Sequence, residues 1–165
     1  MFIFLLIIQF IFSQDIVYFD GDRSMEHLEY QCSFGPRFPG SPAHDNFADS
    51  LKFFLDNLSE MNLVFTDTLN NPLNNKKVKI TNFHTRFNPR ASNRIMLMAH
   101  WDTREIADRD PNPENHHLPI LGANDGASGT AVLMVLAEML SKNKLSNIGI
   151  DLLFIDGEDM GRSGD

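Results

Sequence analysis

Residues 94–105 read RIMLMAHWDTRE, and this stretch decides the fold together with two later ones. It opens with a nearly all-apolar run that suits a strand buried on both faces of a parallel sheet. The chain turns polar at His100, where the predicted strand ends. A second apolar run, IGIDLLFI at residues 148–155, ends as abruptly at the acidic turn DGEDMG of residues 156–161. We therefore predict two central strands, each followed by acidic residues.

The segment between these runs is helical in pattern. From residue 125 to residue 142 apolar side chains recur at spacings of three and four, and Lys142 suits the negative end of the helix dipole. Strand, loop, helix and strand in this order indicate a right-handed crossover, which places the carboxyl ends of both strands at one edge of the sheet. Asp125, within GANDGASG of residues 122–129, would lie at that edge. The residues expected to converge there are His100, Asp102, Asp125, Glu158 and Asp159.

Such a cluster of carboxylates with one imidazole needs a compensating charge, because like charges repel at short range and burial adds a desolvation cost. A divalent cation supplies it. Imidazole and carboxylate ligands without thiolate are compatible with zinc, which in catalytic sites keeps three protein ligands and one open position. In the alternative interpretation Asp125 caps the helix and the other acids are solvated. Three acid clusters at matching positions favour the metal.

The three acidic turns resemble those of the co-catalytic zinc aminopeptidase superfamily. AHWDTRE at residues 99–105 and ADRDPNP at residues 107–113 are most similar to its bacterial glutaminyl cyclase-like branch, and GPRFPGSPAH at residues 35–44 resembles the family's segment before the first long helix. The resemblance implies an α/β fold, a three-layer α/β/α sandwich with a mixed, mostly parallel central sheet.

The resemblance also implies residue roles. Asp125 and Asp159 would bind zinc, Glu158 would be the catalytic acid/base, and Asp102 would orient His100. With one zinc, as in a cyclase, His100 does not contact the metal and lies next to the residues that do. With two zincs, as in an aminopeptidase, His100 is itself a ligand and Asp125 bridges the metals. Many relatives carry two glutamates at the third turn, whereas this chain has the shorter aspartate second.

Other side chains near these turns receive simpler predictions. Trp101 is expected to form an apolar wall of the substrate pocket, bordered by the aperiodic loop of residues 103–119. The two histidines of that loop are predicted to be solvated. The first long helix should begin near Pro42, and His44 in its first turn is predicted to be a surface or capping residue and not a ligand.

Residues 62–69 and 77–87 alternate between polar and apolar side chains and are joined by a turn-rich segment. This pattern predicts an antiparallel hairpin near a sheet edge. The predicted sheet is therefore mixed, with an antiparallel start and a parallel core.

The chain of 165 residues is long enough for one domain. We expect residues 15–165 to be the N-terminal part of a single zinc-peptidase-like catalytic domain, because the resembled family has a further ligand histidine with no counterpart before Asp165. The fold is accordingly expected to be truncated, and this length of chain to be inactive by itself.

The first twelve residues are almost wholly apolar and too few to span a bilayer comfortably. They predict a signal peptide at residues 1–14, with a membrane anchor as the alternative. The mature protein would then be secreted or periplasmic, without stable membrane association. The net charge of -8 argues against nucleic acid and anionic membrane surfaces and is compatible with substrates bearing a free amine. Cys32, the single cysteine, excludes an internal disulfide and a thiolate zinc site.

The resemblance implies a zinc-dependent glutaminyl-peptide cyclotransferase, which converts the N-terminal glutamine of a peptide or protein to pyroglutamate and releases ammonia. A zinc aminopeptidase, in which Glu158 activates a water, is the alternative. A non-catalytic binding domain on the same fold is a third possibility. Glu158 argues against it, because a binding module needs no base beside the metal. The segments AHWDTRE and ADRDPNP favour the cyclase.

Overall fold

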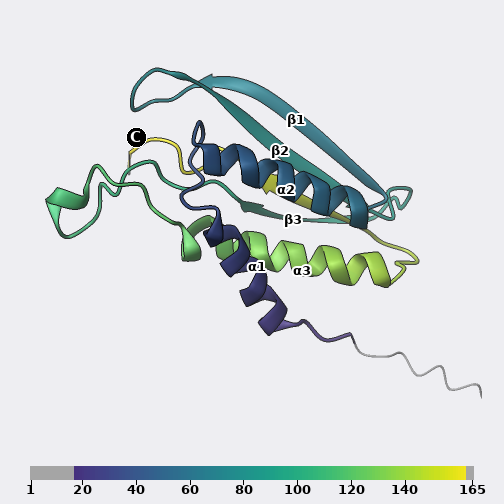
Figure 1. Ribbon diagram of the computed structural model, residues 1–165. Coiled ribbons are helices and arrows are strands. Elements are labelled where there is room, and N and C mark those ends of the chain that lie inside the picture. Colours follow the sequence, from purple (N-terminus) through teal and green to yellow (C-terminus); the bar gives the residue numbers. More distant parts are fainter. Residues whose placement is uncertain (1–16, 163–165) are drawn as a thin grey trace, which may run out of the picture.

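The computed structural model describes residues 17–162, so the predicted signal peptide lies outside the described residues. Figure 1 shows helices gathered beside a twisted sheet. The elements in chain order are α1 (Gly21–Ser33), α2 (Pro42–Leu58), β1 (Met61–Asn70), β2 (Lys77–Phe87), β3 (Arg94–His100), the short turn η1 (Pro113–Asn115), the irregular turn η2 (Ala123–Ala127), α3 (Ser128–Lys142) and β4 (Gly149–Ile155).

The sheet has the strand order β1-β2-β4-β3. β1 and β2 form the predicted antiparallel hairpin, and β2 also pairs antiparallel with β4. β3 and β4 are parallel neighbours, with Leu97 opposite Leu152 and His100 opposite Ile155. The prediction of a mixed sheet with a crossover helix between two parallel strands is confirmed.

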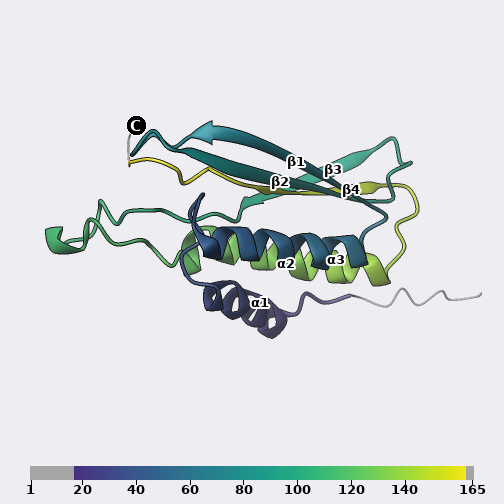
Figure 2. The same ribbon diagram turned by 45° about the horizontal axis from the view of Figure 1, so that its top comes forward.

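Three helices lie on one face of the sheet (Figure 2), with α2 and α3 against the strands and α1 packed on α3. α2 begins where predicted, because the Ser41 side chain accepts a hydrogen bond from His44 N at 3.1 Å and Pro42 suits the first turn. Phe47, Leu51 and Leu55 recur every fourth residue and are fully buried. Each such side chain contributes about 1.5–3 kcal/mol by leaving water.

β4 is a central strand as predicted, and Leu152 and Phe154 are buried in the core. The same prediction for the apolar run at β3 is wrong for the described residues. β3 is the edge strand, and Ile95 and Met98 are 47% and 58% exposed. The physical reason is that no described residue pairs with its second edge or covers the sheet face away from the helices, as Figure 2 shows.

A polar cluster joins three strands at the end of the sheet away from the acidic turns. Asp151 of β4 accepts hydrogen bonds from Arg94 Nε at 2.6 Å and Arg86 Nε at 2.9 Å, and His84 Nε2 lies 3.2 Å away. The Arg94 guanidinium, followed by Arg86, holds the pKa of the Asp151 carboxyl far below its usual range, although burial opposes the shift. The one acid within the apolar run of β4 is thus an ion-pair partner.

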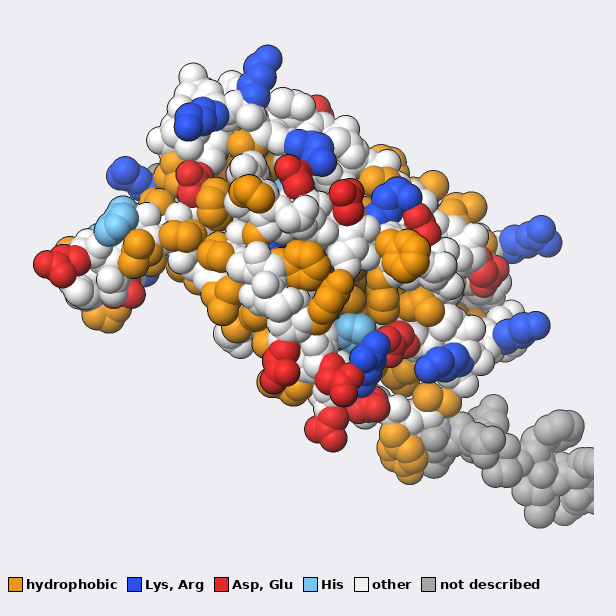
Figure 3. Space-filling model, viewed as in Figure 1, with side chains coloured by type: hydrophobic (Ala, Val, Ile, Leu, Met, Phe, Trp, Pro, Cys, Tyr) orange, Lys and Arg blue, Asp and Glu red, His pale blue; other side chains and the backbone are white. Residues whose placement is uncertain are grey.

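The surface facing the viewer in Figure 3 carries acidic side chains over α1, which contains Asp22, Glu26 and Glu29. Among residues 17–162 no helix combines the length and the apolar character needed to cross a membrane.

Candidate active site

The ends of β3 and β4 bring the first and third acidic turns together. Just after β3, Trp101 N donates a hydrogen bond to Ile155 O at 2.9 Å. The segments that follow β3 and β4 therefore stay side by side as they leave the sheet. Thr130, in the first turn of α3, donates its hydroxyl to His100 O at 2.8 Å. The first hydrogen bond joins the first and third turns, and the second brings the start of α3, which follows the second turn, to the first.

Three of the predicted site residues lie within 4 Å of the His100 imidazole. Nε2 lies 3.0 Å from Asp125 Oδ1, and Nδ1 lies 3.4 Å from Asp102 Oδ1 and 3.7 Å from Glu158 Oε2. Asp102, followed by weaker contributions from the other two acids, raises the pKa of His100 to about 9 against the opposing effect of burial. The predicted convergence of His100, Asp102, Asp125 and Glu158 is confirmed.

Asp102 is fully buried and holds more than the histidine. Its Oδ1 accepts a hydrogen bond from Glu158 N at 3.3 Å and its Oδ2 one from Asp159 N at 3.0 Å. A buried carboxylate bonded to two successive amides fixes the backbone of the third turn. The Glu158 side chain itself is 59% exposed, so its carboxylate is free to meet a substrate.

Asp159 belongs to the same turn as Glu158, but its side chain pairs with the guanidinium of Arg104. Its Oδ1 accepts a hydrogen bond from Arg104 Nε at 2.9 Å, and Arg104 Nη1 is 3.0 Å from Asp108 Oδ1. Arg104 was not predicted as a site residue, although it belongs to the segment AHWDTRE. The ion pair ties the base of the loop after β3 to the third turn.

Asp125 lies in a non-helical turn and does not cap α3. The helix begins at Ser128, three residues later than predicted, and has no side-chain cap. Asp125 and Gly126 have non-helical backbone angles, with φ +89° at Gly126. A Cβ at that glycine would lie 2.5 Å from Asp102 O. Glycine therefore lets the turn approach the end of β3, and the alternative interpretation of Asp125 as a helix cap is wrong.

Trp101 does not form a pocket wall as predicted. Its side chain is fully buried, its Nε1 donates to Thr81 O at 3.1 Å, and its ring packs near Phe47 and Phe83. The reason is the strand geometry, since successive side chains leave a strand in opposite directions and the indole points into the core.

His44 is also placed differently from the prediction. It is fully buried beneath the acidic turns, with Nε2 2.9 Å from Asp156 Oδ1 and 2.8 Å from Oδ2. Burial raises the pKa of Asp156, and the hydrogen bond with His44 opposes this shift. A polar side chain in the first turn of an amphipathic helix is usually exposed, and only a distant carboxylate makes its burial favourable.

The buried Arg37 is a second residue that sequence reasoning missed. Its guanidinium donates to Trp101 O at 3.3 Å, Gln31 O at 3.1 Å and Leu121 O at 3.3 Å. It thereby joins the segment before α2, the end of β3 and the loop that follows. The signal in the sequence was the segment GPRFPGSPAH, which resembled the family without indicating any contact.

The loop after β3 projects away from the sheet, at the left of Figure 1. His117 at its tip is exposed as predicted, whereas His116 is partly buried and its Nε2 lies 2.9 Å from Asp110 O. The loop meets the site at its base, through Arg104.

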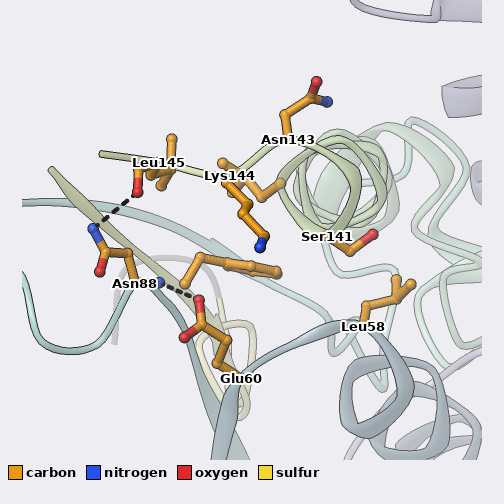
Figure 4. A pocket seen from close by; sticks show the side chains of 9 residues that line it. Leu58, Glu60, Asn88, Ser141, Asn143, Lys144 and Leu145 are labelled. Atoms are coloured by element: carbon orange, nitrogen blue, oxygen red, sulfur yellow. Dashed lines mark hydrogen bonds between the residues drawn. The ribbon is translucent and has the colours of Figure 1, made fainter. Parts of the chain in front are cut away.

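Two of the cavities lie away from the acidic turns. One of about 350 Å³ is at the opposite end of β2, where Glu60, Asn88 and Lys144 line it (Figure 4). A groove of about 510 Å³ runs between α1 and α2, with Tyr30 and Phe53 in its wall. Neither contains a predicted site residue, so the candidate site is defined by the acidic turns.

The donor atoms at the strand ends are imidazole nitrogen and carboxylate oxygen, which fits zinc in kind. In number they fall short, because no group of three His, Cys, Asp or Glu side chains within residues 17–162 is arranged to hold a metal ion. Asp125 and His100 face each other, and Asp159 is paired with Arg104. The described residues thus offer zinc part of a site.

Comparison with known proteins agrees with this architecture. Residues 82–164 match the family described as peptidase family M28, and the chain belongs to that family. It has the zinc aminopeptidase-like fold, as the superposition on Tannerella forsythia glutaminyl cyclase shows, with a TM-score of 0.84, 38% identity, and coverage of 88% of this chain and 50% of that one. Within the family it falls in the glutaminyl cyclase-like branch.

Further similar proteins include a second glutaminyl cyclase and an exopeptidase. Bacteroides thetaiotaomicron glutaminyl cyclase bound to N-acetylhistamine is 35% identical with a TM-score of 0.84, over 91% of this chain and 51% of that one. A Zn-dependent exopeptidase from Parabacteroides distasonis is 34% identical with the same TM-score, over 89% and 50%. The Escherichia coli alkaline phosphatase isozyme conversion protein is 36% identical over 76 residues, which are 46% of this chain and 22% of that protein. The chain spans about half the length of these solved structures.

Proposed function

We propose that the full-length protein is a zinc-dependent glutaminyl-peptide cyclotransferase. The observation that supports it most is the exposed carboxylate of Glu158 beside the His100, Asp102 and Asp125 cluster, on a chain 38% identical to a bacterial glutaminyl cyclase. In this reaction the α-amine of an N-terminal glutamine attacks its own side-chain amide carbon. The amide C–N bond breaks, ammonia leaves, and no water is consumed.

The proposed zinc ligands in this chain are Asp125 and Asp159, with His100 either behind them or as a further ligand. Zinc bound there would act as a Lewis acid that polarises the glutamine amide. The carboxylate of Asp125 is 73% exposed and so accessible to an ion. Asp159 has one oxygen on Arg104 and would use the other. A third protein ligand, which catalytic zinc typically requires, would come from outside the described residues.

Glu158 is the proposed acid/base. Its backbone is held by Asp102, while its exposed side chain can take a proton from the attacking amine and pass it to the departing nitrogen. A positioned group of this kind contributes typically 10²- to 10⁴-fold to the rate. Asp102 is buried beneath Glu158 and is held by the hydrogen bonds that its carboxylate accepts from two backbone amides, those of Glu158 and Asp159.

A zinc aminopeptidase is the second candidate, since the similar structures include a Zn-dependent exopeptidase and a Bacteroides thetaiotaomicron leucine aminopeptidase precursor. The same carboxylate of Glu158 would then deprotonate a water, and the N-terminal residue would be released. The two reactions share the acid/base and differ in what attacks.

A matched pair of peptides separates the candidates. The full-length protein is incubated with one peptide that begins with glutamine and a second that begins with leucine and is otherwise identical, and both are followed by mass spectrometry. A cyclase should lower the mass of the first peptide by that of ammonia and leave the mass of the second unchanged. Free leucine from the second peptide would establish the aminopeptidase, and no change in either would contradict both.

We further propose that the protein acts on peptide or protein N-termini outside the cytoplasm, because residues 1–14 have the apolar character of a secretory signal. N-terminal sequencing of the mature protein from a culture of the producing cells checks this. A mature N-terminus still at Met1 would contradict it.

A further inference from the structure

His44 and Asp156 form a buried pair directly beneath the candidate site. Both side chains are 0% exposed, and Nε2 approaches both carboxylate oxygens. An ionised carboxylate only accepts, so the proton of this bond belongs to His44 Nε2. The imidazole also stacks on Trp101, with ring centroids 4.5 Å apart and 26° between the planes. Trp101 lies between His100 and Asp102 in the sequence. His44 therefore contacts both the first acidic turn, through Trp101, and the third, through Asp156.

Asp156 is in turn fixed to β2. Its Oδ2 accepts a hydrogen bond from Thr81 N at 2.6 Å, and its own N donates to Asn82 Oδ1 at 2.9 Å. Two and three residues further on, the amides of Glu158 and Asp159 donate to Asp102. The turn that carries the proposed acid/base is therefore held at its start by Asp156 and at its end by Asp102.

The buried carboxylate of Asp156 depends on its partner. Without the imidazole, Asp156 would keep the bond from Thr81 N but would be a desolvated charge close to the buried Asp102, and a buried carboxylate in that state rearranges or takes up a proton. Either response moves the start of the turn. Glu158 and Asp159 lie two and three residues away, so a shift there is transmitted to both carboxylates.

We propose that His44 is a positioning residue of the candidate active site: through Asp156 it fixes the turn of residues 156–159 and thereby the carboxylates of Glu158 and Asp159. Its catalytic meaning rests on the proposed function, whereas its effect on the turn does not. His44 contacts no reacting atom in this arrangement. It acts by holding in position Asp159, a proposed zinc ligand, and Glu158, the proposed base.

The test uses the full-length protein and a matched control. H44F keeps a ring to stack on Trp101 but cannot donate a hydrogen bond to Asp156. H27F removes a comparable pair elsewhere, since His27 is also buried and its Nε2 lies 3.0 Å from Glu138 Oε1, between α1 and α3. H44Q is the conservative variant, because the glutamine amide can donate from near the position of Nε2.

Hydrogen exchange is measured first, at the amides of Glu158 and Asp159. We expect H44F to lower their protection by about tenfold or more relative to the wild type, H27F to leave it unchanged, and H44Q to restore most of it. Zinc affinity, measured by competition with a chelating dye, should fall about 10- to 100-fold in H44F, the usual range for residues behind the ligands. The kcat should fall in the same proportion with KM changed less than about threefold.

Equal effects of H44F and H27F on exchange and zinc affinity would overturn the proposal, as would full protection of the turn in H44F. If H44F does not fold, H44Q and D156N make the same comparison: exchange as slow in D156N as in H44Q would overturn it. A wild type that binds zinc but processes neither peptide would refute the proposed function alone. The exchange result would still decide the role of His44.

Discussion

Glu158 is the residue on which the proposed chemistry depends most directly. E158Q should keep the fold and the zinc content of the full-length protein but lower turnover by at least ~100-fold, because the amide is nearly isosteric yet cannot accept and return a proton. The measurement is the rate of ammonia release from the glutamine peptide. Glu114, an exposed glutamate in η1, provides the control, and E114Q should be unaffected. More than about a tenth of wild-type turnover in E158Q would show that another group moves the proton.

Asp125 is tested through metal content. It caps no helix, and its exposed carboxylate lies 3.0 Å from His100 Nε2, where an ion can reach it. D125A should therefore remove most of the zinc from the full-length protein, as measured by elemental analysis after dialysis. D67A, at an exposed site on β1, should retain it. Unchanged zinc in D125A would exclude Asp125 as a ligand.

At the scale of an element, the Asp151 cluster joins β2, β4 and β3, and the low pKa of its carboxyl makes it a source of pH-dependent stability. Because the folded-state pKa lies below the unfolded value of about 4, the stabilisation is complete above that value and is lost as the pH falls through it toward the folded-state pKa. D151N should lower the free energy of unfolding at pH 7 by roughly 3 kcal/mol, as expected for breaking a buried ion pair. The difference from the wild type should shrink below about pH 4.

Urea unfolding at pH 7 and at pH 3 measures this difference. The matched control is Asp56, whose pair with Lys52 at 2.5 Å is solvent-exposed on α2. D56N should cost at most about 1 kcal/mol. Equal losses in D151N and D56N would mean that the cluster contributes no more than a surface ion pair.

At the scale of the whole molecule, the described residues leave one face of the sheet uncovered. Paired residues share a face, so Leu63 and Phe65 of β1 lie on it with Met96 and Met98 of β3, and all four are exposed. An apolar patch of this kind binds dyes and promotes association. The 165-residue polypeptide produced alone should therefore enhance the fluorescence of anilinonaphthalene sulfonate and self-associate.

M98K, placed on the open face of β3, should reduce both the dye signal and the association, measured by fluorescence and analytical ultracentrifugation. D67A, which removes a charge from β1, should not reduce them. A monomeric polypeptide without dye binding would show that this face is covered in solution.

The sequence by itself determined the parallel pair of β3 and β4, the crossover helix, and the meeting of three acidic turns at one edge. These follow from apolar runs, helical periodicity and the handedness of the crossover, which are local properties or general rules. The resemblance added the family. His100, Asp102, Asp125 and Glu158 converge because the topology allows no other place for them.

Only the tertiary structure decided which side chains are buried around that edge. His44 pairs with Asp156, 112 residues later, because a polar ring is buried at low cost only when a distant partner is present. Trp101 fills the core with its ring stacked on His44. The start of α3 shifted past Asp125 because the turn had to approach the end of β3 at Gly126. β3 has the composition of a central strand and lies at the edge of the described sheet, because the exposure of a strand depends on its neighbours and not on its own residues.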